Sequence, residues 1–244
     1  MRARLRAILV FHSIDDSGSV LSYPGKSLDN LLAALERRDI PVLDLDTLLR
    51  PQTRSGVALT FDDGIRTVFS HALPILRRHG APAHLFLTTD YVGKTNRWPT
   101  QPAFAPQFEM LRWSEIDALA AEGVRIEAHT ASHPDLRQLD DADLHAECER
   151  ADEAIARRVG RRPRYFAYPY ALSDARVRAF ARARYAGSLA GGLRALRPDE
   201  DRAALPRVDG YYLRSEWIYG DLRSRRSRVY LFARRALRRL RNAP

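Results

Sequence analysis

The chain has little cysteine, little lysine and no long hydrophobic run. Its 244 residues include a single cysteine, Cys148, so an intramolecular disulfide is excluded. Lys26 and Lys94 are the only lysines, and arginine therefore carries nearly all of the positive charge. The apolar run 7–11 is shorter than the roughly 7–15 residues of a signal-peptide core, and no run approaches the roughly 18 that a spanning helix needs. We therefore expect a cytoplasmic protein.

What is present indicates one α/β domain. Hydrophobic residues make up 45% of the chain, which is enough for a substantial core. Short apolar runs alternate with helical patterns, as in βα units built around a parallel sheet or barrel. The pattern predicts strands at 7–12, 41–44, 57–61, 83–88, 124–128, 164–168, 186–190 and 205–209, and helices at 27–38, 67–79, 114–122, 140–159 and 173–184.

Charge is concentrated at the C-terminal end. The net charge is +10, and residues 222–244 contain nine arginines and no acidic residue. Apolar residues between Val229 and Leu240 recur at helical spacing, which predicts a basic amphipathic helix. This helix could contact an anionic membrane at its cytoplasmic face, dock on the body of the protein, or form a solvated end. The segment lacks a nucleic-acid-binding motif and interleaved aromatics, so nucleic acid is not an expected partner.

Two adjacent carboxylates follow the apolar run 57–61, in the sequence Thr60-Phe61-Asp62-Asp63-Gly64. Neighbouring negative charges raise each other's pKa unless a cation or a hydrogen-bond donor lies close by. The pair at a strand end therefore indicates a site with its own positive charge.

A second cluster, His129-Thr130-Ala131-Ser132-His133, follows the short strand pattern 124–128. Two imidazoles four residues apart can face the same way if the chain turns helically after the strand. One carboxylate and two imidazoles make a three-ligand site for a divalent metal and leave positions open for water and substrate. The other carboxylate is then free to act as a base. The two clusters together predict a metal-dependent hydrolase.

These two motifs, with Phe166-Ala167-Tyr168-Pro169-Tyr170, resemble the signature motifs of the polysaccharide deacetylases, the carbohydrate esterase family 4 group with a NodB-homology domain. The resemblance extends over roughly residues 5–215. It implies a distorted (β/α) barrel of about seven parallel strands, in which chemistry collects at the C-terminal strand ends. We divide the chain accordingly into a catalytic barrel, residues 1–221, and a basic amphipathic tail, residues 222–244.

The resemblance also implies roles for individual residues. Asp62 corresponds to the general base, and Asp63, His129 and His133 correspond to the ligands of one divalent metal. The backbone N–H of Tyr170 corresponds to the group that holds the oxyanion. Two His and one Asp suit zinc, while cobalt and nickel fit similar ligands.

The sequence departs from the usual family pattern in two places. Ala167 stands where the third motif commonly carries an Arg that pairs with the catalytic Asp, and no His follows His145. The stretch 7–14, with His12 at its strand end, resembles the last motif moved to the front, as in the circularly permuted branch of the family. That resemblance implies His12 as the general acid, with Asp15 or Asp16 to orient it.

Other residues leave alternatives open. Arg207 could replace the missing Arg, and Asp209 could face the cleft. Trp98, Phe104 and Trp113 flank or lie in the long segment 91–112 and could either stack on a sugar ring or anchor the loop on the body.

The predicted function is removal of an N-acetyl group from an amino sugar in a glycan, a lipid-linked saccharide or a glycolipid precursor, as in exopolysaccharide or lipopolysaccharide biosynthesis. One alternative is a deformylase or another amidase on a small or lipid-linked molecule. A second is a non-catalytic, membrane-associated glycan-binding protein, which the Ala167 departure favours. The sequence does not name the sugar, its linkage, the metal or the oligomeric state.

Overall fold

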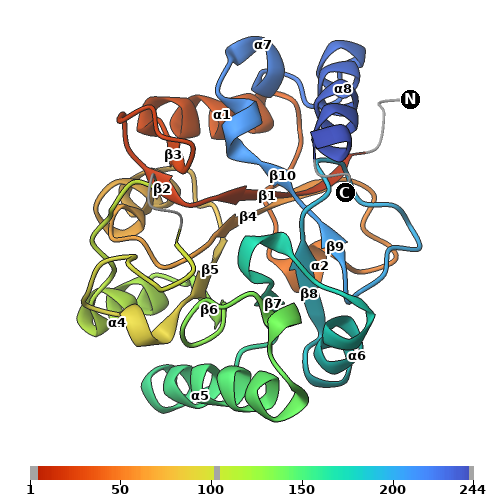
Figure 1. Ribbon diagram of the computed structural model, residues 1–244. Helices are drawn as coiled ribbons and strands as arrows, with labels where there is room; N and C mark the ends of the chain where they lie inside the picture. The colour runs from red at the N-terminus through yellow and green to blue at the C-terminus, as the bar shows by residue number, and fades with distance from the viewer. Residues whose placement is uncertain (1–4, 102–104, 242–244) are drawn as a thin grey trace.

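The computed structural model of the chain describes residues 5–101 and 105–241, with side chains up to residue 238. Eight strands form one parallel sheet in the order β10-β1-β4-β5-β6-β7-β8-β9 (Figure 1). Their bounds are β1 Arg6–Phe11, β4 Gly56–Phe61, β5 Ala83–Leu87, β6 Arg125–Ala128, β7 Tyr165–Ala167, β8 Gly187–Ala190, β9 Leu205–Pro206 and β10 Val208–Asp209.

The two edge strands of this sheet are neighbours in the sequence. β9 pairs with β8 through Leu205 and Leu189, and β10 pairs with β1 through Val208 and Leu9. Only Arg207 separates them, so the single segment 205–209 contacts both edges and nearly closes the sheet into a barrel. β9 and β10 together occupy one strand position, which confirms the predicted distorted barrel of about seven parallel strands.

Helices surround the sheet, as Figure 1 shows. The predicted strand at 41–44 is wrong. Only Val42 forms an isolated bridge there, because the Asp44 side chain accepts the Thr47 N–H at 2.9 Å and starts a helix. The α-helices are α1 Gly25–Arg37, α2 Leu45–Leu48, α3 Leu73–Arg78, α4 Trp113–Ala121, α5 Asp141–Val159, α6 Ala175–Arg184, α7 Glu216–Tyr219 and α8 Arg225–Arg241. Shorter elements are β2 Ser13–Ile14, β3 Ser22–Tyr23, η1 Val68–Ala72, η2 Thr89–Tyr91, η3 Leu136–Gln138, η4 Pro169–Ala171 and η5 Gly210–Leu213.

Alternation along the strands separates the barrel interior from the layer beneath the helices. Ile8, Ala58, Phe86, Tyr165 and Leu205 form one buried cluster, while their strand neighbours belong to a larger cluster that packs against the helices. Further along each strand, every second side chain again points inward and lies closer to the open end of the barrel. The fold therefore gathers the residues that end the strands around one mouth.

Two side chains outside the strand-end mouth, a histidine and the single cysteine, are buried in the core. His84 on β5 is buried, and its Nε2 accepts the Leu45 N–H at 3.0 Å. Cys148 on α5 is also buried, and burial raises the pKa of its thiol to about 12. The thiol is therefore inert at neutral pH.

The C-terminal helix α8 docks on the barrel through part of its surface. Tyr230 and Leu231 pack against the main core, and the Ser227 hydroxyl donates to the Ile218 carbonyl at 2.9 Å. Val229 and Phe232 stay exposed. Within the described residues, no helix has the length and apolar character needed to cross a bilayer. The division of the chain after residue 221 stays a prediction.

Candidate active site and metal centre

Three buried side chains converge at the mouth of the barrel. Asp63 follows β4, and His129 and His133 follow β6. The Asp63 Oδ1 atom lies 3.4 Å from His129 Nε2 and 3.5 Å from His133 Nε2. The two imidazole Nε2 atoms are 3.2 Å apart. Asp63, His129 and His133 are the metal ligands that the sequence predicted, and the structure brings them together.

The orientation of these groups suits a cation. The Ala167 carbonyl accepts from His129 Nδ1 at 2.7 Å, which turns Nε2 of the same ring toward Asp63 and His133. Burial, together with the neighbouring His129, lowers the pKa of His133 to about 3. Burial alone would raise the pKa of Asp63, but the nearby imidazoles lower it. One anionic oxygen and two imidazole nitrogens are a donor set that fits a divalent metal.

Backbone conformation is unusual at the same place. Thr130 accepts the His133 N–H through its Oγ1 at 3.0 Å, which holds the turn between the two imidazoles. Positive φ at a non-glycine residue costs on the order of 1–3 kcal/mol and clusters at functional sites. Of the seven described non-glycine residues with positive φ, five lie here: Asp63, Thr130, His133, Tyr170 and Ala171. The strain is confined largely to the predicted site.

The first carboxylate of the pair has a different partner. Arg207 Nη1 lies 2.7 Å from Asp62 Oδ1, and both side chains are 4% exposed. Burial would raise the pKa of Asp62, but the Arg207 guanidinium and His129 lower it, and the net direction is downward. Arg207 thus occupies the role left open by Ala167. Asp209 also lines the pocket over these groups, and its side chain accepts the Tyr211 N–H at 2.9 Å at the start of η5.

A pocket of about 310 Å³ opens over these groups. His12 lines this pocket because β1 lies between β10 and β4. Asp15 is engaged elsewhere, since it bonds the Ser13 hydroxyl and accepts the Ser17 N–H at 2.8 Å. The strand order places His12 where the general acid was predicted, while the circular permutation itself stays a prediction.

Aromatic side chains surround His133. The Trp98 ring stacks on His133 at a centroid distance of 4.2 Å and is only 3% exposed, so Trp98 supports a predicted ligand instead of offering an open sugar platform. Trp113 begins α4 and packs on the core, and Phe104 lies outside the described residues. Tyr170 contacts the other side of the site, with its ring 4.6 Å from His133 and 38% of its surface exposed.

The backbone role predicted for Tyr170 requires an N–H without a backbone partner. Its N–H donates to no backbone acceptor in the part of the chain that the structure describes. The Tyr170 and Thr100 hydroxyls are 2.7 Å apart, and Thr100 also donates to the His133 carbonyl at 3.0 Å. This network fixes the loop that carries the N–H beside the metal ligands.

Sequence reasoning missed three contributors. Thr100 joins Tyr170 to His133, and Glu147 on α5 accepts from the Ser132 hydroxyl at 2.9 Å. Arg238 reaches the pocket from α8, nearly thirty residues beyond the last strand. Nothing in local spacing signals these contacts, because each depends on how distant elements pack.

Comparison with known proteins agrees with this geometry. The family model described as polysaccharide deacetylase matches residues 50–186. The chain belongs to the polysaccharide deacetylase family. It is 32% identical to a chitin deacetylase of Colletotrichum lindemuthianum over 142 residues, which cover 58% of this chain and 51% of that protein. It is 34% identical to a chitooligosaccharide deacetylase of Bradyrhizobium sp. over 122 residues, covering 49% and 48%. The chain thus spans about half the length of these curated relatives.

Solved structures share the fold across most of the chain. The deacetylase PplD of Streptococcus pyogenes in complex with acetate matches with a TM-score of 0.72 at 18% identity, covering 86% of this chain and 93% of that one. IcaB of Ammonifex degensii matches with a TM-score of 0.70 at 21% identity, covering 88% and 99%. The polysaccharide deacetylase barrel therefore includes the strands outside the matched region 50–186.

The ligand geometry gives a direct prediction about metal content. Purified protein should hold about one divalent ion per chain, because three buried side chains bring their donor atoms within 4.8 Å of one another. Replacing His133 with Ala should remove that ion, as measured by elemental mass spectrometry. His71→Ala, on exposed η1, is the matched control. A His133→Ala protein that keeps a full complement of metal would contradict the assignment.

Proposed function

We propose that the chain is a metal-dependent hydrolase that removes the N-acetyl group from an amino sugar in a glycan, a lipid-linked saccharide or a glycolipid precursor. One observation carries the proposal. A buried carboxylate, Asp62, stands beside a metal-ligand group at the mouth of a polysaccharide deacetylase barrel, and it is held ionised by Arg207. Chitin and chitooligosaccharide deacetylases among the relatives support the N-acetyl amino sugar as the substrate.

A divalent metal bound at Asp63, His129 and His133 would polarise the acyl carbonyl and acidify a water; we propose zinc. The remaining steps belong to the chain's own residues. Asp62 accepts a proton from the water while the oxygen of that water forms a bond to the acyl carbon. The Tyr170 N–H donates to the oxygen on which negative charge develops, a contribution typically worth about 3 kcal/mol.

His12 completes the reaction. As the carbon–nitrogen bond breaks, His12 donates a proton to the departing amine, and the products are a free amino sugar and acetate. An imidazole suits this step because its unperturbed pKa lies close to neutral pH. His12, Asp62 and Tyr170 all line the same pocket. The proposed acid, base and oxyanion donor would therefore surround an acyl group bound there.

The Arg207 pairing bears on the non-catalytic alternative. Its support in the sequence was the missing Arg at Ala167, and Arg207 supplies a guanidinium to Asp62 from another strand. A protein without turnover would have no use for a buried, charge-balanced base beside three metal ligands. The hydrolase is therefore the better reading of the pocket.

The experiment is release of acetate from N-acetylated chitooligosaccharides, measured with and without a chelator. We expect acetate release that the chelator abolishes and added metal restores. A matched N-formylated substrate separates the deformylase alternative, because formate released faster than acetate would favour it. Metal-loaded protein that releases neither acid from glycan or lipid-linked substrates would overturn the proposal.

A further inference from the structure

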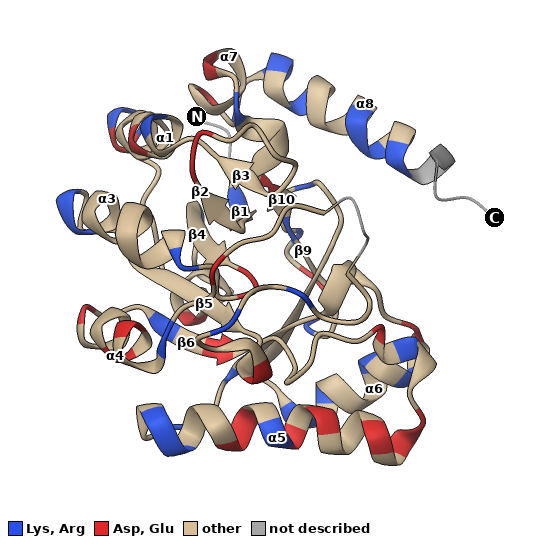
Figure 2. Cartoon of the chain, turned by 60° about the vertical axis from the view of Figure 1, so that its left-hand side comes forward, with Lys and Arg blue, Asp and Glu red and all other residues tan. Residues whose placement is uncertain are grey.

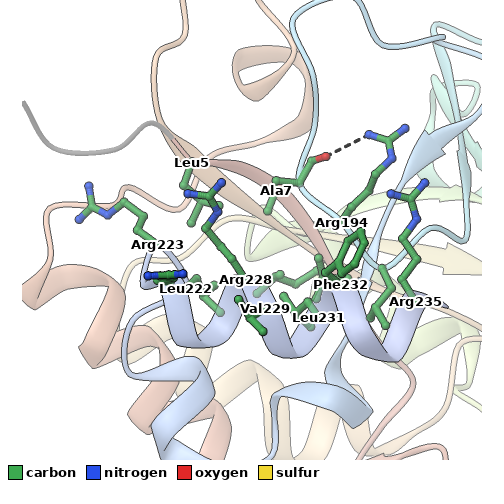
Figure 3. A pocket seen from close by; sticks show the side chains of 15 residues that line it. Leu5, Ala7, Arg194, Leu222, Arg223, Arg228, Val229, Leu231, Phe232 and Arg235 are labelled. Carbon is green, nitrogen blue, oxygen red and sulfur yellow. Dashed lines mark hydrogen bonds between the residues drawn. The ribbon is translucent and has the colours of Figure 1, made fainter. Parts of the chain in front are cut away.

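A second cavity, larger than the catalytic pocket, lies between α8 and the outer face of β1 and β10 (Figure 3). Its volume is about 900 Å³, at the upper end of the range for small-molecule sites, and it shares no lining residue with the catalytic pocket. Its apolar lining is Leu5, Ala7, Leu9, Leu193, Val208, Leu222, Val229, Leu231 and Phe232. Docking of α8 therefore leaves an apolar space on the barrel unfilled.

Guanidinium groups surround this apolar lining. Figure 3 shows Arg228 and Arg235 extending from α8 on the same side as Phe232. Arg225 and Arg228 are exposed and form no ion pair with any residue that the structure describes. Arg194, on the facing loop, is balanced by Glu200 at 2.5 Å. Figure 2 shows basic bands along α8 and no acidic one, unlike α5, which carries both signs.

Bulky apolar side chains of α8 face solvent beside these arginines. Val229 is 58% exposed and Phe232 is 70% exposed. Arg225, Val229, Phe232 and Arg235 recur at spacings of three and four residues, so they share one face of the helix. An exposed apolar strip beside cationic side chains is costly in water, and it matches the layered chemistry of a bilayer surface.

The neighbouring α7 adds another exposed aromatic side chain. Trp217 is 46% exposed, its ring lies 5.1 Å from Tyr230, and the Arg226 guanidinium lies 5.2 Å above it. Tryptophan and tyrosine favour the boundary between lipid headgroups and chains. The α7–α8 pair thus adds an exposed interfacial aromatic next to the helix that carries the apolar strip and its arginines.

We propose that α8 binds the surface of an anionic phospholipid membrane. Val229 and Phe232 enter the boundary between headgroups and acyl chains, the cavity behind α8 receives an acyl chain, and Arg225 and Arg228 contact lipid phosphates. Charge complementarity selects an anionic surface, and the apolar cavity selects a lipid over a soluble anion or a nucleic acid. The inference is independent of the proposed reaction.

The same helix links this surface to the catalytic pocket. Arg238, about three and a half turns beyond Arg225, lines that pocket. Arg234 and Arg238 lie over the Tyr212 ring at 5.1 and 5.9 Å, which holds this end of α8 on the barrel. A leaflet bound along α8 would therefore lie beside the pocket mouth.

The test is flotation of the full chain with vesicles of phosphatidylcholine alone or with added phosphatidylglycerol. We expect binding to the anionic vesicles only, and weaker binding at high salt. Arg225→Gln with Arg228→Gln should lower the partition coefficient about 30-fold, since each basic residue at an anionic surface contributes about fivefold. Phe232→Ser should lower it about tenfold.

The matched control removes two exposed arginines of another face, Arg157→Gln with Arg162→Gln, and should change binding little. Circular dichroism checks that each variant stays folded. Three results would overturn the proposal: no flotation with anionic vesicles, equal flotation with neutral ones, or equal losses in the control and α8 variants. Heparin can be added to compete with the anionic vesicles. If Phe232→Ser floats as well as the unmodified chain and heparin displaces both equally, the ligand is a soluble polyanion and the proposal is wrong.

Discussion

Asp62→Asn should lower turnover about 10²–10⁴-fold while the metal content of the protein stays unchanged. The substitution keeps the shape of the side chain but removes the oxygen that accepts a proton. Asp62 lies outside the group of three side chains that could hold a metal, so we expect metal binding not to depend on it. Turnover is measured as acetate release, and metal content by elemental mass spectrometry on the same sample.

The control for this variant is Asp117→Asn on α4, which removes an exposed carboxylate paired with Arg158 far from the pocket. Its activity should match that of the unmodified chain. Full activity in Asp62→Asn would show that another group acts as the base. Loss of metal in the same variant would show that Asp62 is a ligand.

The second large effect concerns the partner of Asp62. Arg207→Met removes a buried charge but keeps a side chain of similar length, and it leaves Asp62 buried without its counterion. Breaking a buried pair in this way costs about 3–5 kcal/mol of the free energy of unfolding. Arg207→Lys should recover part of this loss, because it keeps the charge but not the planar guanidinium. Denaturant unfolding measures both.

Activity of Arg207→Met should also change with pH. Arg207 is the main group that lowers the pKa of Asp62 against the effect of burial, so its removal raises that pKa. Only ionised Asp62 accepts a proton, and the acidic limb of kcat/KM should therefore move to higher pH in metal-saturated enzyme. An unmoved limb together with a loss of unfolding free energy would assign Arg207 a purely structural role.

The same pair contributes to stability in a defined pH range. The pKa of Asp62 is lower in the folded chain than the ordinary carboxyl value of 3.8. The contribution is therefore present above that value and is lost as the pH falls toward the folded-state pKa. In Arg207→Met, where the folded-state pKa rises, this part of the acid dependence should disappear.

The clustering of the three predicted metal ligands could be foreseen from sequence because each lies within five residues of a strand end. Asp63 follows the run 57–61, and His129 and His133 follow the run 124–128. Parallel strands in one barrel bring such ends to one mouth, so local pattern and fold class together place the ligands. Arg207 was only a possible replacement for the missing Arg, since nothing in local spacing shows that its guanidinium reaches Asp62.

Other contacts depend on packing that local pattern does not encode. Trp98 was expected either to meet a sugar or to anchor its loop, and it stacks on His133 because the segment after η2 folds back over β6. The strand predicted at 41–44 was wrong because Asp44 is the N-cap of α2, so the chain turns into a helix directly after it. The position of α8 depends on Tyr230 and Leu231, two side chains whose helical spacing left docked and exposed arrangements equally open.

The closing segment 205–209 also has a consequence for how the chain is made. β1 pairs with β10 through Leu9 and Val208, two residues from opposite ends of the sequence. Contacts of such separation form late in folding, because the intervening chain must first be ordered. On a ribosome, Asp63, His129 and His133 emerge long before Arg207. A nascent chain could therefore assemble its three predicted metal ligands while Asp62 still lacks its counterion and β1 still lacks its second neighbour.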